Sequence, residues 1–145
     1  MREILFRAKR LYGGEWIEGL LWKKKCNSNK LFLSCFSNED DDDEFFVVDP
    51  ETVGQFTGLT DKNGVKIFEG DIVKATILEN SGFGTKRYTK DYIIKYHEKY
   101  CYFYLARERN NLLFDGNWSY GVKNVEVIGN IFDNPELLKG GGTDD

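Results

Sequence analysis

The chain has 145 residues, enough for one domain or for a small domain with a subdomain, and enough to bury a core without disulfides or a metal. Hydrophobic residues make up 41% and charged residues 30%, which is typical of a folded globular protein and not of a disordered chain. The net charge of -4 comes largely from one acidic run, Glu39–Glu44, and it excludes the overall basic character of most nucleic-acid-binding domains.

The composition favours strands over helices. Aromatic residues (15%) and 15 glycines favour strands and turns, only 2 prolines are present, and no long segment has helical periodicity. We therefore predict a mainly β protein. Three cysteines without a Cys-x-x-Cys pair, no leading apolar segment and no run long enough to span a bilayer predict a cytoplasmic protein with reduced thiols.

The N-terminal third predicts a hairpin and a third strand. Alternating residues at Glu3–Ala8 and Glu15–Trp22 flank Gly13-Gly14, which is a hairpin turn signal. Lys30–Phe36 predicts another strand, which alternates between a face with Leu31, Leu33 and Cys35 and a face with Phe32, Ser34 and Phe36.

The acidic run separates this part from a short fourth strand. Because neighbouring like charges repel, we place residues 38–44 in a solvated loop. Phe45–Val48 is apolar and predicts a strand that Asp49-Pro50 ends. Pro50–Val53 then predicts a turn or a single helical turn.

Two tight turns lie at the centre of the chain. Asn63-Gly64 tolerates positive φ and allows the chain to reverse between strands at Phe56–Leu59 and Val65–Phe68. Glu69–Asp71 predicts a second turn, which leads into a strand at Ile72–Leu78 with uniformly apolar odd positions.

The second half predicts a long hairpin. After a glycine-containing loop at Glu79–Thr85, Lys86–Tyr96 alternates over its whole length and pairs with Tyr100–Ala106 across a turn at Glu98-Lys99. One face of the first strand carries Tyr88, Tyr92, Ile94 and Tyr96.

The C-terminal part predicts two more strands and one helix. The strands are Leu112–Phe114 and Val125–Phe132, and Asn134-Pro135 is typical of a helix start, so a helix of one or two turns follows. Residues 140–145 form a predicted disordered tail. Many short strands joined by short turns indicate a small barrel or twisted sheets.

The carboxylates of the central turns are the first candidate site. Glu69 and Asp71 could serve as a metal or acid/base pair, but we favour a turn in which the aspartate caps backbone N–H groups. Asp61, Asn63 and Gly64 match part of a calcium-binding loop, but the remaining ligands are missing, so turn chemistry is again favoured.

Other candidates are weaker. The acidic run could bind Ca²⁺ or Mg²⁺ or imitate nucleic-acid phosphate, but a solvated insertion is the simpler interpretation. His97 is the only histidine, and no neighbouring motif argues for a triad or a zinc site. Cys26, Cys35 and Cys101 are predicted to be small core or half-buried residues. We predict no catalytic, cofactor or metal residues.

The tyrosine-rich strands at Tyr88–Tyr96 and Tyr100–Tyr104 have basic neighbours, and such a face can stack nucleic-acid bases. The same pattern is expected of a sheet with one face in the core, which we favour. The residues of the nucleic-acid hypothesis are Lys86, Arg87, Tyr88, Lys90, Lys95, Arg107 and Arg109.

Four blocks, Met1–Ala8, Val53–Gly64, Ile67–Val73 and Glu126–Leu138, resemble the YopX-like family of phage and prophage proteins of Gram-positive bacteria. The resemblance runs from end to end and implies an SH3-like barrel in the later part. The domains expected are an N-terminal β subdomain at 1–54 and the barrel at 55–139. The family has no established activity, so no functional residues are carried over.

The function predicted is that of an uncharacterised phage or prophage protein, a non-enzymatic binding or assembly module in the host cytoplasm. The alternative is a nucleic-acid-binding module that uses the aromatic and basic hairpin 86–109. The expected partners are a second copy of the chain in a homo-oligomer or an unknown phage or host protein, with nucleic acid less favoured. No cofactor and no membrane are expected.

Overall fold

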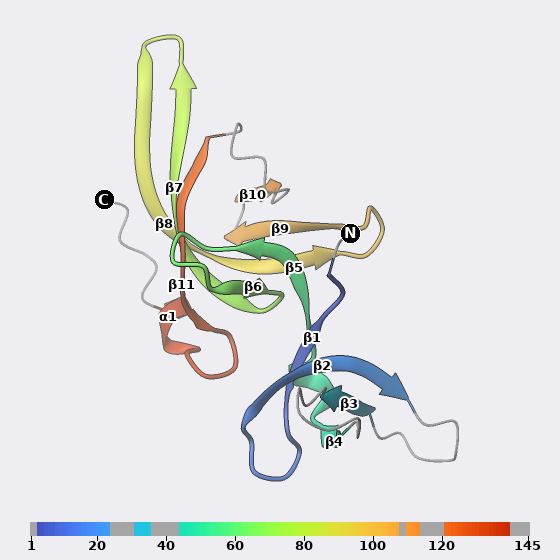
Figure 1. Cartoon of the computed structure of the whole chain (residues 1–145). Helices are drawn as coiled ribbons and strands as arrows, with labels where there is room; N and C mark the ends of the chain where they lie inside the picture. Colours follow the sequence, from blue (N-terminus) through green and yellow to red (C-terminus); the bar gives the residue numbers. More distant parts are fainter. Residues whose placement is uncertain (1–2, 24–30, 36–43, 108–109, 114–120, 140–145) are drawn as a thin grey trace. The chain divides into compact units, whose positions relative to one another are not determined.

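The structure, a computed structural model, describes residues 3–23, 31–35, 44–107, 110–113 and 121–139. It divides into two compact units, Met1–Gly58 and Leu59–Asp145, whereas the sequence suggested a boundary after residue 54. The mainly β prediction is confirmed, because the strands form two antiparallel sheets (Figure 1). The predicted acidic loop, apart from its last residue, and the predicted tail lie outside the described residues.

The first sheet has the strand order β4-β3-β2-β1-β5-β6. Its strands are β1 (Phe6–Lys9), β2 (Trp16–Lys23), β3 (Leu31–Cys35), β4 (Glu44–Val48), β5 (Gly54–Thr60) and β6 (Lys66–Phe68). The predicted N-terminal hairpin is confirmed, with Phe6 opposite Gly19 and Lys9 opposite Trp16. Glu44, predicted to lie in the loop, instead opens β4 opposite Cys35, because pairing with β3 satisfies its backbone.

A small core holds the first unit together. Ala8, Leu33 and Val48 are buried, and four partly buried apolar side chains pack against them. The 3-10 turn η1 (Pro50–Thr52) follows β4, and Asp49 Oδ1 accepts a hydrogen bond from its Glu51 N–H (3.1 Å), so the predicted single helical turn is confirmed.

The second sheet has the order β10-β9-β8-β7-β11. Its strands are β7 (Asp71–Ser81), β8 (Gly84–His97), β9 (Tyr102–Arg107), β10 (Asn110–Leu113) and β11 (Val122–Asn130). Strands β7 to β10 follow one another as hairpins, and β11 returns to pair with β7. The short helix α1 (Glu136–Lys139) confirms the predicted C-terminal helix.

The predicted loop at Glu79–Thr85 is wrong. Strand β7 continues to Ser81 and β8 starts at Gly84, so only Gly82 and Phe83 form the turn. Polar residues can form these strands because both faces are in water, and the Thr85 and Asn80 side chains hydrogen-bond across the hairpin (2.8 Å).

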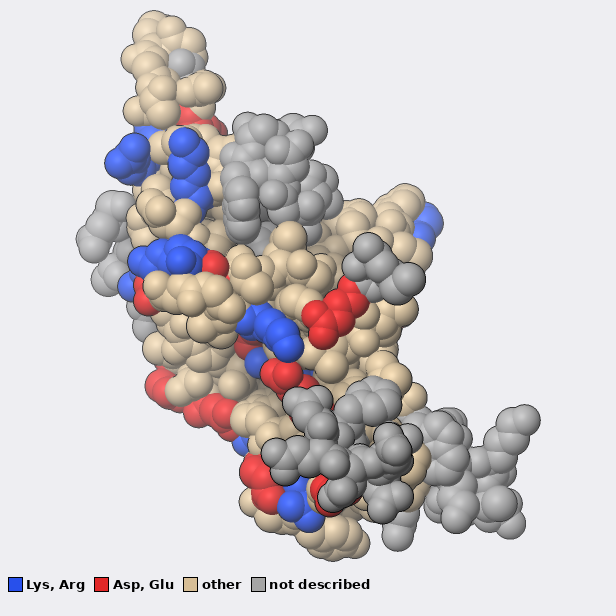
Figure 2. All heavy atoms as spheres, viewed as in Figure 1, with Lys and Arg blue, Asp and Glu red and all other residues tan. Residues whose placement is uncertain are grey.

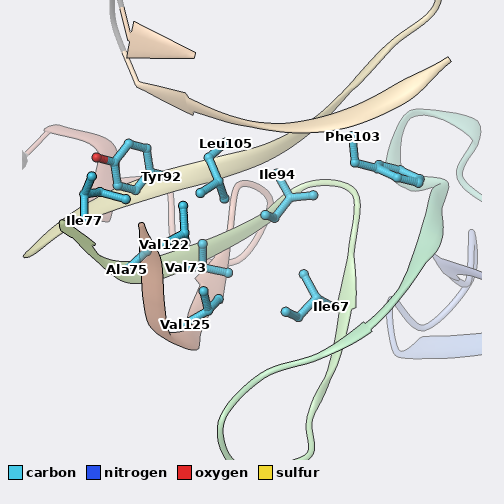
Figure 3. Close-up of a cluster of buried hydrophobic side chains, with 10 residues drawn as sticks. All are labelled: Ile67, Val73, Ala75, Ile77, Tyr92, Ile94, Phe103, Leu105, Val122 and Val125. Atoms are coloured by element: carbon cyan, nitrogen blue, oxygen red, sulfur yellow. The ribbon is translucent and has the colours of Figure 1, made fainter. Parts of the chain in front are cut away.

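The main core lies in the second unit, where one face of β7, β8 and β9 meets side chains of β6 and β11 (Figure 3). Its buried members are Ile67, Val73, Ala75, Ile77, Tyr92, Ile94, Phe103, Leu105, Val122 and Val125. The apolar odd positions of β7 are therefore core positions, as predicted. The SH3-like barrel stays a prediction, since the strand pairs of the described residues place β10 and β11 at the two ends of this sheet.

Candidate functional site

The Asp61 carboxylate closes the first central turn. Its Oδ1 accepts hydrogen bonds from the backbone N–H of Asn63 (2.8 Å) and Val65 (2.9 Å), and its Oδ2 accepts one from Val127 of β11 (3.0 Å). Burial raises the pKa of this carboxyl, but the backbone donors outweigh burial and hold the pKa below its usual value. The turn interpretation is confirmed, and the carboxylate also joins the turn to the last strand.

Asp71 plays the corresponding part in the second turn. It is 1% exposed, and its Oδ2 accepts a hydrogen bond from the Phe68 N–H (2.8 Å), which confirms the predicted turn cap. Glu69 is half-buried, and its pKa is raised by burial and by the charge of Glu98. The Asp71 carboxylate is therefore fully buried and caps the turn, whereas the Glu69 carboxylate is only half-buried. Gly70 between them has φ 91°, a backbone conformation that favours glycine.

A group of aromatic rings lies at the end of the β8–β9 hairpin. This aromatic cluster consists of His97, Tyr100, Tyr102 and Tyr104. The His97 ring centre is 5.0 Å from that of Tyr100 and 5.1 Å from that of Tyr102, and Tyr102 meets Tyr104 edge-on at 6.1 Å. Tyr100 is 62% exposed, and the Lys99 ammonium lies over its ring at 5.1 Å.

Strand register places this cluster on the face of the hairpin opposite the core, where Tyr100 and Tyr102 are exposed and His97 and Tyr104 are half-buried. Phe103 and Leu105 of β9 are buried, so Tyr102 and Tyr104 project from the opposite face of the strand. His97 is directly opposite Tyr102, and Lys95 is directly opposite Tyr104. The cluster therefore covers the outer face of the hairpin with aromatic rings beside a lysine.

The tyrosines of β8 lie on the other face. Tyr92 is a buried core residue, and Tyr88 and Tyr96 pack against the core, so the favoured core interpretation is confirmed for this strand. The predicted aromatic face is thus divided between two sides of the sheet. The strand predicted from the sequence ended at Tyr96, so the cross-strand register was needed to bring His97 to Tyr102.

The predicted basic contacts are also divided between the two faces. Lys86 and Lys90 share a face with Tyr88, and the Lys90 ammonium lies 5.4 Å from the centre of the Tyr88 ring. Arg87 and Lys95 project from the opposite face by strand alternation. The Arg107 guanidinium donates a hydrogen bond to the Asp91 backbone carbonyl (3.5 Å). Arg109 lies outside the described residues.

The far end of the β7–β8 hairpin projects beyond β11 (Figure 1). We call residues 79–87 the arm. Among the described residues, β11 pairs with β7 only as far as Ile77, and the last hydrogen bond between them is from Leu78 N–H to the Gly121 carbonyl (2.7 Å). Phe83 at its tip is 104% exposed. Figure 2 shows Lys and Arg side chains on this hairpin below an uncharged tip.

Cys101 departs from the expectation for the cysteines. It was predicted to be a core or half-buried residue, but it is exposed in the β8–β9 turn with φ 55°. The turn is closed by its N–H, which donates to the His97 carbonyl (2.8 Å), and this places its side chain in solvent. Cys26 and the side chain of Cys35 lie outside the described part of the chain.

Within the described ranges, no group of three or more His, Cys, Asp or Glu side chains could hold a metal ion. No helix in the described part of the chain is long and apolar enough to cross a membrane.

Comparison with known proteins identifies relatives. The family model described as YopX protein matches residues 5–139. The crystal structure of protein EF1440 from Enterococcus faecalis is similar at 28% sequence identity, with 95% of this chain and 99% of that chain covered and a TM-score of 0.54. No curated protein sequence matches.

Proposed function

Because this chain belongs to the YopX family, we propose that it is a non-enzymatic binding or assembly module of phage or prophage origin that works in the cytoplasm of a bacterial host. Its binding surface is the aromatic cluster of the β8–β9 hairpin. The partner is a second copy of the chain or a phage or host protein.

The exposure of the aromatic cluster carries this proposal. Tyrosine is enriched among the residues that dominate binding energy, because its ring buries a large area while its hydroxyl stays hydrogen-bonded. Cross-strand ring pairs also stabilise a hairpin. Stabilisation of the hairpin requires only the cross-strand pair of His97 and Tyr102. Tyr100 lies beyond this pair, extends the ring surface into the turn and is 62% exposed.

Affinity capture from prophage-induced or infected cells tests the proposal. We expect the Tyr100→Ala/Tyr102→Ala variant to lose two aromatic anchors. The amount of partner that it captures should therefore be lower than that of the native chain by a factor of about ten or more. Tyr12→Ala is the matched control, since Tyr12 is an equally large side chain, 71% exposed, in the other unit. Thermal unfolding must show that the variant is folded. Equal capture by a folded double variant contradicts the proposal.

Nucleic-acid binding is the second candidate function. The observation in its favour is that Lys86 and Arg87 lie on a projecting hairpin, with Lys90 nearer its base. Glu79 is an acid directly opposite Lys86. The same capture experiment separates the two candidates. A partner that disappears from the native chain after nuclease treatment supports nucleic acid, and one that remains supports a protein.

A further inference from the structure

We propose that the arm is a contact for duplex DNA in which Phe83 wedges between neighbouring base pairs. This inference rests on the second candidate function, nucleic-acid binding, and it goes beyond that function by naming the form of nucleic acid and the mode of contact. The aromatic cluster plays no part in it.

The arm has the shape that a groove requires. It is a two-stranded ribbon with no third strand alongside it in the described residues, and two-stranded ribbons are known to enter the grooves of DNA. Gly82 and Gly84 flank Phe83, and no heavy atom lies within 4 Å of the position of an added Cβ at either glycine. The tip is therefore narrow, with one large side chain at its end.

The arm carries one cation on each face and one acid, Glu79, which lies directly opposite Lys86, so bases outnumber acids in it. Lys86 and Arg87 are exposed neighbours in β8, so they project from opposite faces of the ribbon. A ribbon within a groove has phosphates on both sides and needs cations on both faces. A single strand stacked on a flat surface would instead need cations and aromatic rings on the same face.

The apolar content of the arm argues for a wedge and against a protein pocket. Phe83 is the only apolar side chain in residues 79–87, and its neighbours Asn80 and Thr85 are polar and hydrogen-bonded to each other (2.8 Å). Protein interfaces usually bury a cluster of apolar anchors. A single apolar side chain beside cations is typical of proteins that unstack one base step and kink the duplex.

The test uses the full-length protein and a short synthetic duplex with a 2-aminopurine next to a TA step, since such steps unstack readily. We expect the native chain to bind at low salt and to raise the fluorescence of the 2-aminopurine. Phe83→Ala should still bind, with roughly tenfold lower affinity, but without the rise in fluorescence. Phe83→Leu should restore most of the rise, because leucine is also an effective wedge.

The cations are tested separately. Lys86→Gln and Arg87→Gln should each reduce the slope of log affinity against log salt by about 0.9, while the fluorescence rise at saturating protein is unchanged. Tyr12→Ala is the control and should match the native chain in both measurements.

The outcomes distinguish the two proposals. Binding with the same fluorescence rise for Phe83→Ala overturns the wedge but leaves nucleic-acid binding intact. No binding of the native chain at low salt removes nucleic-acid binding and the wedge together. A change in the sedimentation of the protein alone on Phe83→Ala, without an effect on the duplex, assigns the tip to contact with a second copy instead.

Discussion

Replacement of Asp61 by alanine is expected to lower the free energy of unfolding by about 3 kcal/mol. The substitution leaves the backbone N–H groups of Asn63, Val65 and Val127 without their carboxylate acceptor. Because Asp61 is only 7% exposed, water replaces the lost acceptor incompletely. Urea unfolding of both proteins at neutral pH measures the difference. A loss below about 0.5 kcal/mol, the size of an ordinary surface substitution, would show that water serves the turn equally well.

Asp61→Asn removes the charge and one of the two acceptor oxygens, and it predicts a pH dependence. The folded pKa of Asp61 is lowered from 3.8, so its ionised form stabilises the fold at pH values above 3.8. That stability is lost as the pH falls below 3.8 through the folded pKa. The difference between the native chain and Asp61→Asn should therefore be largest near neutral pH and shrink in acid. A difference that does not change with pH contradicts the assigned role of the charge.

Replacement of Ile94 by alanine is expected to cost about 3 kcal/mol. Ile94 is 0% exposed in the main core, and the truncation leaves a cavity that the surrounding strands fill only partly. Lys95→Ala is the control, because Lys95 is the next residue of β8 and is exposed. It should change stability by less than about 0.5 kcal/mol. A larger loss for Lys95→Ala than for Ile94→Ala would mean that the side chains of β8 are assigned to the wrong faces, since a register shift of one residue exchanges them.

The core and the turns could be predicted from the sequence because both leave local signals. Alternation at Val73, Ala75 and Ile77 has the two-residue period of a half-buried strand, and all three side chains are buried. Asn63-Gly64 marked the first turn, and Gly64 has φ 79° there.

The candidate surfaces could be predicted only in part, because they depend on relations between strands. The sequence indicated the tyrosines and the basic residues as candidates. Their division between two faces depends on which face of β8 enters the core, and the sequence alone does not give that. Glu79–Thr85 of the arm was predicted as a loop, because exposed strands have no apolar alternation that indicates them. The bond from Asp61 to Val127 spans 66 residues, and no local pattern indicates it.

The strand order of the second sheet has a consequence for how this unit folds. Strands β7 to β10 pair with their neighbours in sequence, so loop closure between them costs little entropy, whereas β11 must return to β7 across the whole meander. We expect pulse-labelling hydrogen exchange to show protected amides in β8 and β9 before β11, and simultaneous protection would contradict this order. Until β11 arrives, the outer edge of β7 has unpaired backbone groups, which makes the period before its docking the time when nascent chains are most prone to aggregate.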